Sequence, residues 1–138
     1  MVSAPPSLEE FAATVREAFA FLGRYGVQEI TAPAHRHRDA FQIWFGAGGR
    51  FVVVAGEGHG TMASVTLEHN GRFLSEIDLV PANERPAPVG GRRQRTQLEQ
   101  VREAARRLER HGGDFLAGDV TRFLAIAKPL PPYKQRLD

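Results

Sequence analysis

Two histidines and an aspartate, His35, His37 and Asp39, alternate with arginines in the first third of the chain. In an extended segment, side chains two residues apart point to the same side, so these three groups could converge on one metal ion. His59 is the further histidine that we would expect as an additional ligand. The interleaved arginines raise the positive potential and oppose cation binding. We therefore favour a polar start of a strand over a metal site, and we expect no metal or other cofactor.

The same three residues resemble the first part of the His-x-His-x-Asp-His motif of metallo-β-lactamases. Ala40 stands where that motif has its last histidine, and 138 residues are fewer than that fold needs. The resemblance therefore implies no hydrolase activity for this chain.

A glycine-rich stretch, Gly56-Glu-Gly-His-Gly60, has the composition of a phosphate-binding loop. Such loops bind phosphate when they lead into a helix, because the amides at the helix N-terminus and the helix dipole hold the anion. Here the residues that follow, Thr61–Glu68, have the pattern of a strand. We therefore expect a flexible hairpin turn instead of a phosphate site.

Groups that could act as general acids or bases are scattered along the chain. By residue type alone the candidates are Glu29, Glu57, Glu68, Glu76, Asp78, His59 and His69. The sequence pairs none of them, it contains no cysteine, and it places no serine in the context of a nucleophile elbow. We therefore predict that the protein is not an enzyme.

Arginines gather in the last third of the chain and could contact phosphate groups. The arginines concerned are Arg92, Arg93, Arg95, Arg102, Arg106 and Arg110. Glu99 and Glu103 lie among them at three- and four-residue spacing, where ion pairs form along a helix surface. A self-neutralised, solvated face is therefore favoured, and a nucleic-acid-binding ridge is the alternative.

Length and composition indicate one soluble domain spanning residues 1–138. The chain has 42% hydrophobic and 25% charged residues and a net charge of +2, which is too small to demand a polyanionic partner. Its apolar runs are too short to cross a membrane, and Met1–Pro6 lacks the features of a signal peptide. We therefore expect a cytoplasmic protein with no membrane contact. Residues 1–6 and 129–138 are expected to be extended or mobile tails.

The centre of the chain has the period of two that a pleated strand requires. In Phe41-Gln42-Ile43-Trp44-Phe45, one face is apolar and the other mixed. Asn70-Gly71 is a favoured two-residue hairpin turn. The expected strands are Val27–Thr31, Ala40–Phe45, Arg50–Ala55, Thr61–Glu68 and a last one from Arg72 to about Val80.

Helical spacing of apolar residues predicts helices on both sides of these strands. Ser7 and Glu10 form a capping box at the start of a helix over Ser7–Arg24. A second box, Thr96-Gln-Leu-Glu99, starts a helix that ends near Gly112, and Asp114 or Asp119 caps the last one. The order predicts an α+β fold: an N-terminal helix, an antiparallel meander of four to five strands, and two C-terminal helices packed on the sheet.

Two segments of the sequence resemble segments of small bacterial α+β proteins of the immunity-protein-like kind. They are FLGRYGV at positions 21–27 and LERHGGDFLAGD at positions 108–119, with Phe123 after the second. Val27 and His111 depart from the aromatic residues expected there. The matching positions are apolar residues and glycines, so the resemblance implies packing and a role as a toxin-neutralising partner, and it transfers no functional residue.

Our functional expectation is therefore a non-enzymatic module that binds another protein, in the manner of an immunity protein that neutralises a toxin. The candidate binding residues lie on or beside the sheet: Arg36, Arg38, Gln42, Trp44, His59 and His69. Trp44 could serve as an aromatic anchor of an interface. Its other possible role is core on a second covered face of the sheet.

Overall fold

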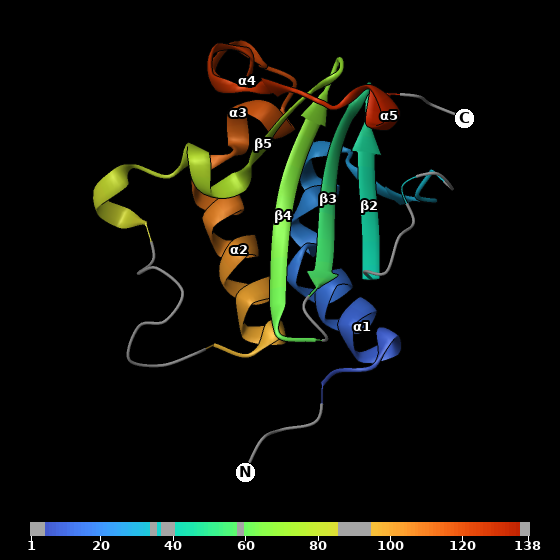
Figure 1. Cartoon of the computed structure of the whole chain (residues 1–138). Coiled ribbons are helices and arrows are strands. Elements are labelled where there is room, and N and C mark those ends of the chain that lie inside the picture. Colours follow the sequence, from blue (N-terminus) through green and yellow to red (C-terminus); the bar gives the residue numbers. More distant parts are fainter. Residues whose placement is uncertain (1–4, 34–35, 37–40, 58–59, 86–94, 136–138) are drawn as a thin grey trace.

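A curved antiparallel sheet forms the centre of the computed structural model (Figure 1). The structure describes residues 5–33, 36, 41–57, 60–85 and 95–135. Within that part the sheet has six strands, in the order β1-β2-β3-β4-β5-β6, with every neighbour antiparallel. The strands are β1 (Gln28–Ile30), β2 (Phe41–Ala47), β3 (Arg50–Glu57), β4 (Met62–His69), β5 (Arg72–Ser75) and β6 (Lys128–Pro129). The predicted α+β meander is confirmed, and β6 takes the strand count above the predicted four to five.

The tight turn between β4 and β5 fixes the register at one end of the sheet. Asn70 and Gly71 have φ values of 54° and 74°, as a two-residue hairpin turn requires. Leu67 therefore pairs with Leu74. The predicted strand to Val80 was too long, because β5 ends at Ser75. Ser75 and Asp78 cap each other at the start of a 3₁₀ helix, η3 (Glu76–Leu79).

The two capping boxes expected from the sequence are both present. Ser7 caps α1 (Leu8–Ala18), and Thr96 caps α2 (Gln97–His111). The first helix is shorter than the predicted Ser7–Arg24, because the chain tightens into a 3₁₀ helix, η1 (Ala20–Tyr25). Gly26, with φ of 72°, ends η1.

One face of the sheet is covered by α1 and α2 and holds the main hydrophobic core. Phe11 of α1, Leu108 of α2 and Leu67 of β4 are almost fully buried. Gly56 of β3 lets these layers approach, since a Cβ there would lie 2.8 Å from the Phe11 ring. Full burial of one such apolar side chain contributes about 1.5–3 kcal/mol, so this face supplies most of the packing free energy.

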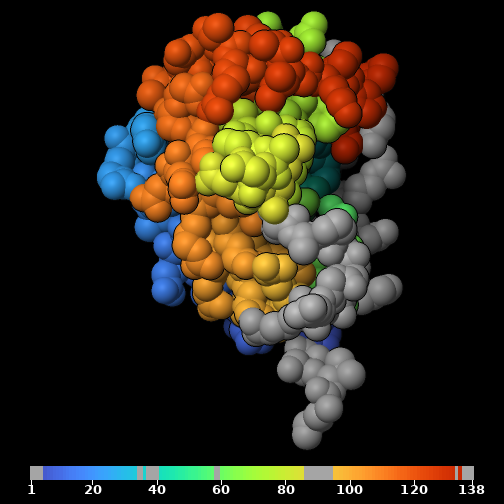
Figure 2. Space-filling view, turned by 90° about the vertical axis from the view of Figure 1, so that its left-hand side faces the viewer, coloured from blue at the N-terminus to red at the C-terminus, as the bar shows by residue number. Residues whose placement is uncertain are grey.

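The C-terminal part folds into short pieces that cross the end of the sheet. They are α3 (Gly113–Leu116), α4 (Thr121–Ile126), β6 and α5 (Pro132–Gln135), and a further 3₁₀ helix, η4 (Ala82–Glu84), lies near α2. The last predicted helix is thus two helices, separated where Gly118 adopts φ of 101°. Residues 132–135 are helical, although we expected an extended tail. Figure 2 shows these C-terminal residues (red) above η3, η4 and α2 on one side of the molecule.

The second face of the sheet is formed by the side chains that alternate with the main core. Trp44 alternates with the core residues Ile43 and Phe45, and it is 2% exposed. In Figure 1, α1 and α2 lie behind the sheet whereas α5 lies in front of it. In the described part of the chain, no helix combines the length and apolar character of a membrane span.

Candidate functional site

β1 does not extend far enough to pair with the first residues of β2. Ile30, the last residue of β1, pairs with Trp44, so β1 accompanies only the middle of β2. Phe41, Gln42 and Ile43 have a strand partner in β3 but, among the residues described, none on the opposite side. A strand edge that lacks a paired neighbour among the described residues offers backbone donors and acceptors to an incoming segment.

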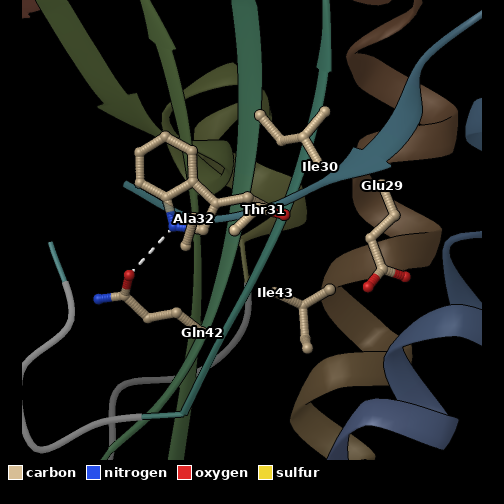
Figure 3. Close-up of a pocket in the computed structure, with 7 residues that line it drawn as sticks. Glu29, Ile30, Thr31, Ala32, Gln42 and Ile43 are labelled. Atoms are coloured by element: carbon tan, nitrogen blue, oxygen red, sulfur yellow. Dashed lines mark hydrogen bonds between the residues drawn. The ribbon is translucent and has the colours of Figure 1, made fainter. Parts of the chain in front are cut away.

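A hollow of about 470 Å³ lies where the strands separate. We call this cavity the edge hollow. It is lined by Glu29, Ile30, Thr31, Ala32, Gln42, Ile43 and Trp44. The continuation of β1 forms one wall and the start of β2 forms the other (Figure 3). Ile30 is 37% exposed there, a high value for an isoleucine beside a sheet. The edge hollow thus combines an apolar wall with strand backbone.

Two polar contacts shape the edge hollow. The Trp44 indole Nε1 donates a hydrogen bond to Gln42 Oε1 over 3.0 Å, which orients the amide along the β2 wall (Figure 3). On the other wall, Arg16 Nε and Nη2 donate to the two Glu29 carboxylate oxygens over 2.8 and 2.9 Å. These hydrogen bonds lower the pKa of Glu29. The carboxylate is therefore ionised, and its charge is balanced.

Behind the edge hollow, the second face carries four residues that we call the tryptophan cluster: Arg36, Trp44, Phe51 and Glu68. Arg36 Nη1 and Nη2 donate to the Glu68 oxygens over 2.9 and 2.6 Å, and the two side chains are 9% and 6% exposed. The Arg36 Cζ lies 4.9 Å from the Trp44 ring centre, a cation–π distance. The Phe51 ring meets Trp44 edge-on at 5.7 Å.

Gly46 makes the junction between the hollow and the cluster possible. A Cβ at that position would lie 3.0 Å from the Phe51 ring and 3.2 Å from Ile30 Cδ1. A glycine in the strand therefore leaves room for both side chains over β2. The side chains of Ile30 and Phe51 thus both lie against Gly46, and Phe51 in turn contacts Trp44.

Of the six residues predicted for protein binding, the structure brings Arg36, Gln42 and Trp44 together. His69 lies elsewhere: its Nδ1 donates to the Gly49 carbonyl over 3.0 Å, and its ring meets Phe123 edge-on. Arg38 and His59 lie outside the described residues, as do His35, His37 and Asp39 of the histidine pattern. Within the residues described, no three histidines, aspartates or glutamates form a group that could hold a metal ion.

The four described arginines of the nucleic-acid alternative are all exposed, and two of them form ion pairs with glutamates that the structure shows. Arg95 pairs with Glu103 over 2.7 Å, and Arg110 pairs with Glu84 over 3.1 Å. Arg102 and Arg106 are exposed, whereas Arg92 and Arg93 lie outside the part that is described. Glu103 therefore pairs with an arginine before α2, not with one three or four residues away.

Sequence reasoning identified Glu68 and Glu76 only by residue type and missed their partners. Glu76 is 4% exposed and accepts hydrogen bonds from Arg107 Nε and Nη2 at 2.6–3.2 Å. Burial raises the pKa of Glu76 more than Arg107 lowers it. The available signal for Glu68 was its position next to the core residue Leu67, which places it on the second face. Its partner Arg36, 32 residues away, leaves no periodic trace in the sequence.

Comparison of the chain with protein-family models, with curated proteins and with solved structures finds no match.

Proposed function

We propose that the protein is a non-enzymatic, cytoplasmic module that binds another protein, in the manner of an immunity protein that neutralises a toxin, and that the edge hollow receives the partner. The observation that carries this proposal is that the pairing of β1 with β2 ends at Ile30 and Trp44. It leaves the backbone of Phe41–Ile43 beside a hollow with an exposed isoleucine.

An extended segment of the partner suits this geometry best. Such a segment can add to a strand edge through main-chain hydrogen bonds, while its alternate side chains enter adjoining pockets. Ile30 offers apolar contact, and Gln42 offers an amide at the same wall. Stable interfaces bury about 800 Å² on each partner, so the surface around the edge hollow must contribute as well.

The opposite edge of the sheet is a poorer place for strand addition. β6 has two residues, and Pro129 has no backbone N–H to donate. Pro131 and Pro132 follow after Leu130. Prolines are a common protection of sheet edges against pairing. The two edges thus differ in kind, and we place the partner at the β1–β2 edge.

The test is a capture experiment followed by a direct affinity measurement. The tagged protein is exposed to a lysate of its native host, and each protein that it captures is purified and titrated by calorimetry. Ile30→Asp should weaken binding about tenfold or more, since a central apolar contact contributes roughly 1–2 kcal/mol. Leu124→Asp is the matched control, because Leu124 on α4 is 42% exposed and distant in sequence.

Equal affinities of the two variants would contradict the edge hollow as the binding site. Recovery of nothing but the protein itself would count against a protein partner. The nucleic-acid alternative is decided with the same preparation, by titrating random DNA and RNA at low and high salt. Phosphate contacts from the exposed arginines Arg102 and Arg106 would appear as affinity that falls steeply with salt.

A further inference from the structure

The C-terminal residues Leu130–Gln135, which we call the strap, lie over the second face of the sheet. The strap is rooted beside β6, where Leu130 N donates to the Gly71 carbonyl over 2.8 Å and the Leu130 side chain is 7% exposed. Its far end reaches the tryptophan cluster, because Arg36 Nη1 donates to the Lys134 carbonyl over 3.4 Å. In Figure 1 the strap crosses in front of the strands, on the side away from α1 and α2.

The strap contacts Arg36 through a main-chain carbonyl, a group that every polypeptide offers. A partner carbonyl could therefore accept the Arg36 hydrogen bond in place of the Lys134 carbonyl. The charge of Arg36 does not depend on the strap, because Glu68 neutralises it from β4. Arg36 thus stays paired with Glu68 when the strap lifts, so its buried charge is not left without a partner.

The helical part of the strap has little stability of its own. α5 is a single turn of four residues, and isolated helices shorter than about 12 residues are marginal in water. Its conformation therefore depends on docking against the sheet. A segment of this kind belongs to the low-stability end of a fold, where local opening occurs without global unfolding.

The tryptophan cluster connects the strap with the edge hollow. Trp44 lines the hollow, donates to Gln42 there, and carries Arg36 on its ring. We propose that the strap is a displaceable cover, and that the tryptophan cluster joins the partner-binding surface when the strap lifts. This inference rests on the proposed function, because it assigns a regulation to the same surface.

A fluorescent label on the strap tests the movement in the full-length chain. The sequence contains no cysteine and a single tryptophan, so a bimane on Lys134→Cys reports on Trp44 by contact quenching. Bimane emission should be lower than in the same labelled chain that carries Trp44→Phe. Saturation with the purified partner should restore it. A bimane on Leu124→Cys should show neither effect. Emission at position 134 that saturating partner leaves unchanged would overturn the proposal.

A second variant measures whether the strap competes with the partner. Pro132 is exposed at the start of α5, so Pro132→Gly loosens this turn without removing buried contacts. If the strap is closed in about nine-tenths of the molecules, loosening it should raise partner affinity up to about tenfold. An affinity that stays the same or falls while the bimane emission rises would refute a cover.

Hydrogen exchange of the free protein gives a result without any partner. The amides of the strap should exchange much faster than those of β3 and β4, and Pro132→Gly should accelerate them further. Strap amides as protected as those of β4 would refute the displaceable cover and leave the edge hollow untouched. Conversely, full partner affinity in Ile30→Asp would remove the edge hollow and leave the strap measurements standing.

Discussion

The two faces of the sheet are covered in different ways. The face under α1 and α2 is apolar and packed by side chains from both helices, with Phe11, Leu67 and Leu108 almost fully buried. The second face buries an ion pair, Arg36–Glu68, beside a tryptophan and lies under a one-turn helix. One face thus holds the main core, whereas the cover of the other face is the part of the fold that we propose to be displaceable.

The energetic difference follows from what each face buries. Apolar burial contributes about 25 cal/mol per Å² to the free energy of folding. This contribution is lost only when the face opens. A buried ion pair contributes little net stability, because desolvation offsets the attraction, but removal of one partner is costly.

The helix-covered face should be the most sensitive to truncation. Phe11→Ala removes a fully buried ring between α1 and the sheet, and we expect a loss of about 3–5 kcal/mol in the free energy of unfolding. Urea denaturation followed by circular dichroism measures it. Leu8→Ala in the same helix is the control, since Leu8 is 51% exposed and its loss should cost about 0.5 kcal/mol or less.

On the second face, removing one partner of the Arg36–Glu68 ion pair should lower the free energy of unfolding more than replacing both partners by apolar residues. Glu68→Ala leaves Arg36 buried without its carboxylate, and we expect a loss of about 3 kcal/mol. The double variant Arg36→Met/Glu68→Leu should regain much of that loss. Glu57→Ala controls for removing an exposed glutamate from the sheet. A single variant as stable as this control would show that the pair is not desolvated.

The second buried carboxylate, Glu76, should give a pH-dependent effect of intermediate size. Because burial raises its pKa in the folded state, its protonated form is favoured by folding, and that contribution is lost as pH rises through the folded pKa. The stability of wild type relative to Glu76→Gln should therefore increase from about pH 7 to about pH 5. Denaturation curves at the two pH values measure it, and a flat difference would contradict a desolvated carboxylate.

The smallest effect is expected at the rim of the edge hollow. The Arg16–Glu29 pair is exposed, so Glu29→Gln should change stability slightly and less still at high salt. Because Arg16 lowers the pKa of Glu29, the contribution is present above the unfolded pKa and is lost as pH falls through the folded pKa. A salt-independent change in the denaturation midpoint would show that Glu29 has another partner.

Local rules predicted much of this fold, because they act within a few residues. The capping boxes at Ser7 and Thr96, the Asn70-Gly71 turn and the alternation around Phe41–Phe45 are all local signals, and each is present. β6 was missed because two residues that include a proline carry no strand period. β5 was overextended because Ser75 and Asp78 compete with the strand.

The candidate site was less predictable than the fold. The edge hollow exists because β1 ends at Ile30, opposite Trp44, so that Phe41–Ile43 at the start of β2 have no partner in β1. No residue pattern in the sequence marks such a difference in strand length. Arg36 was selected from its type and position, but its partner Glu68 lies on β4. Pairings between distant segments are set by the packing of the whole chain, so they could not be derived from spacing.

The proline at the far edge of the sheet also limits self-assembly. Fibres grow when a molecule accepts a neighbour on one side and offers an equivalent surface on the other. With Pro129 closing one side, a copy that pairs through β1 leaves no second template for the next copy. Association through this sheet would therefore stop at a closed pair of molecules.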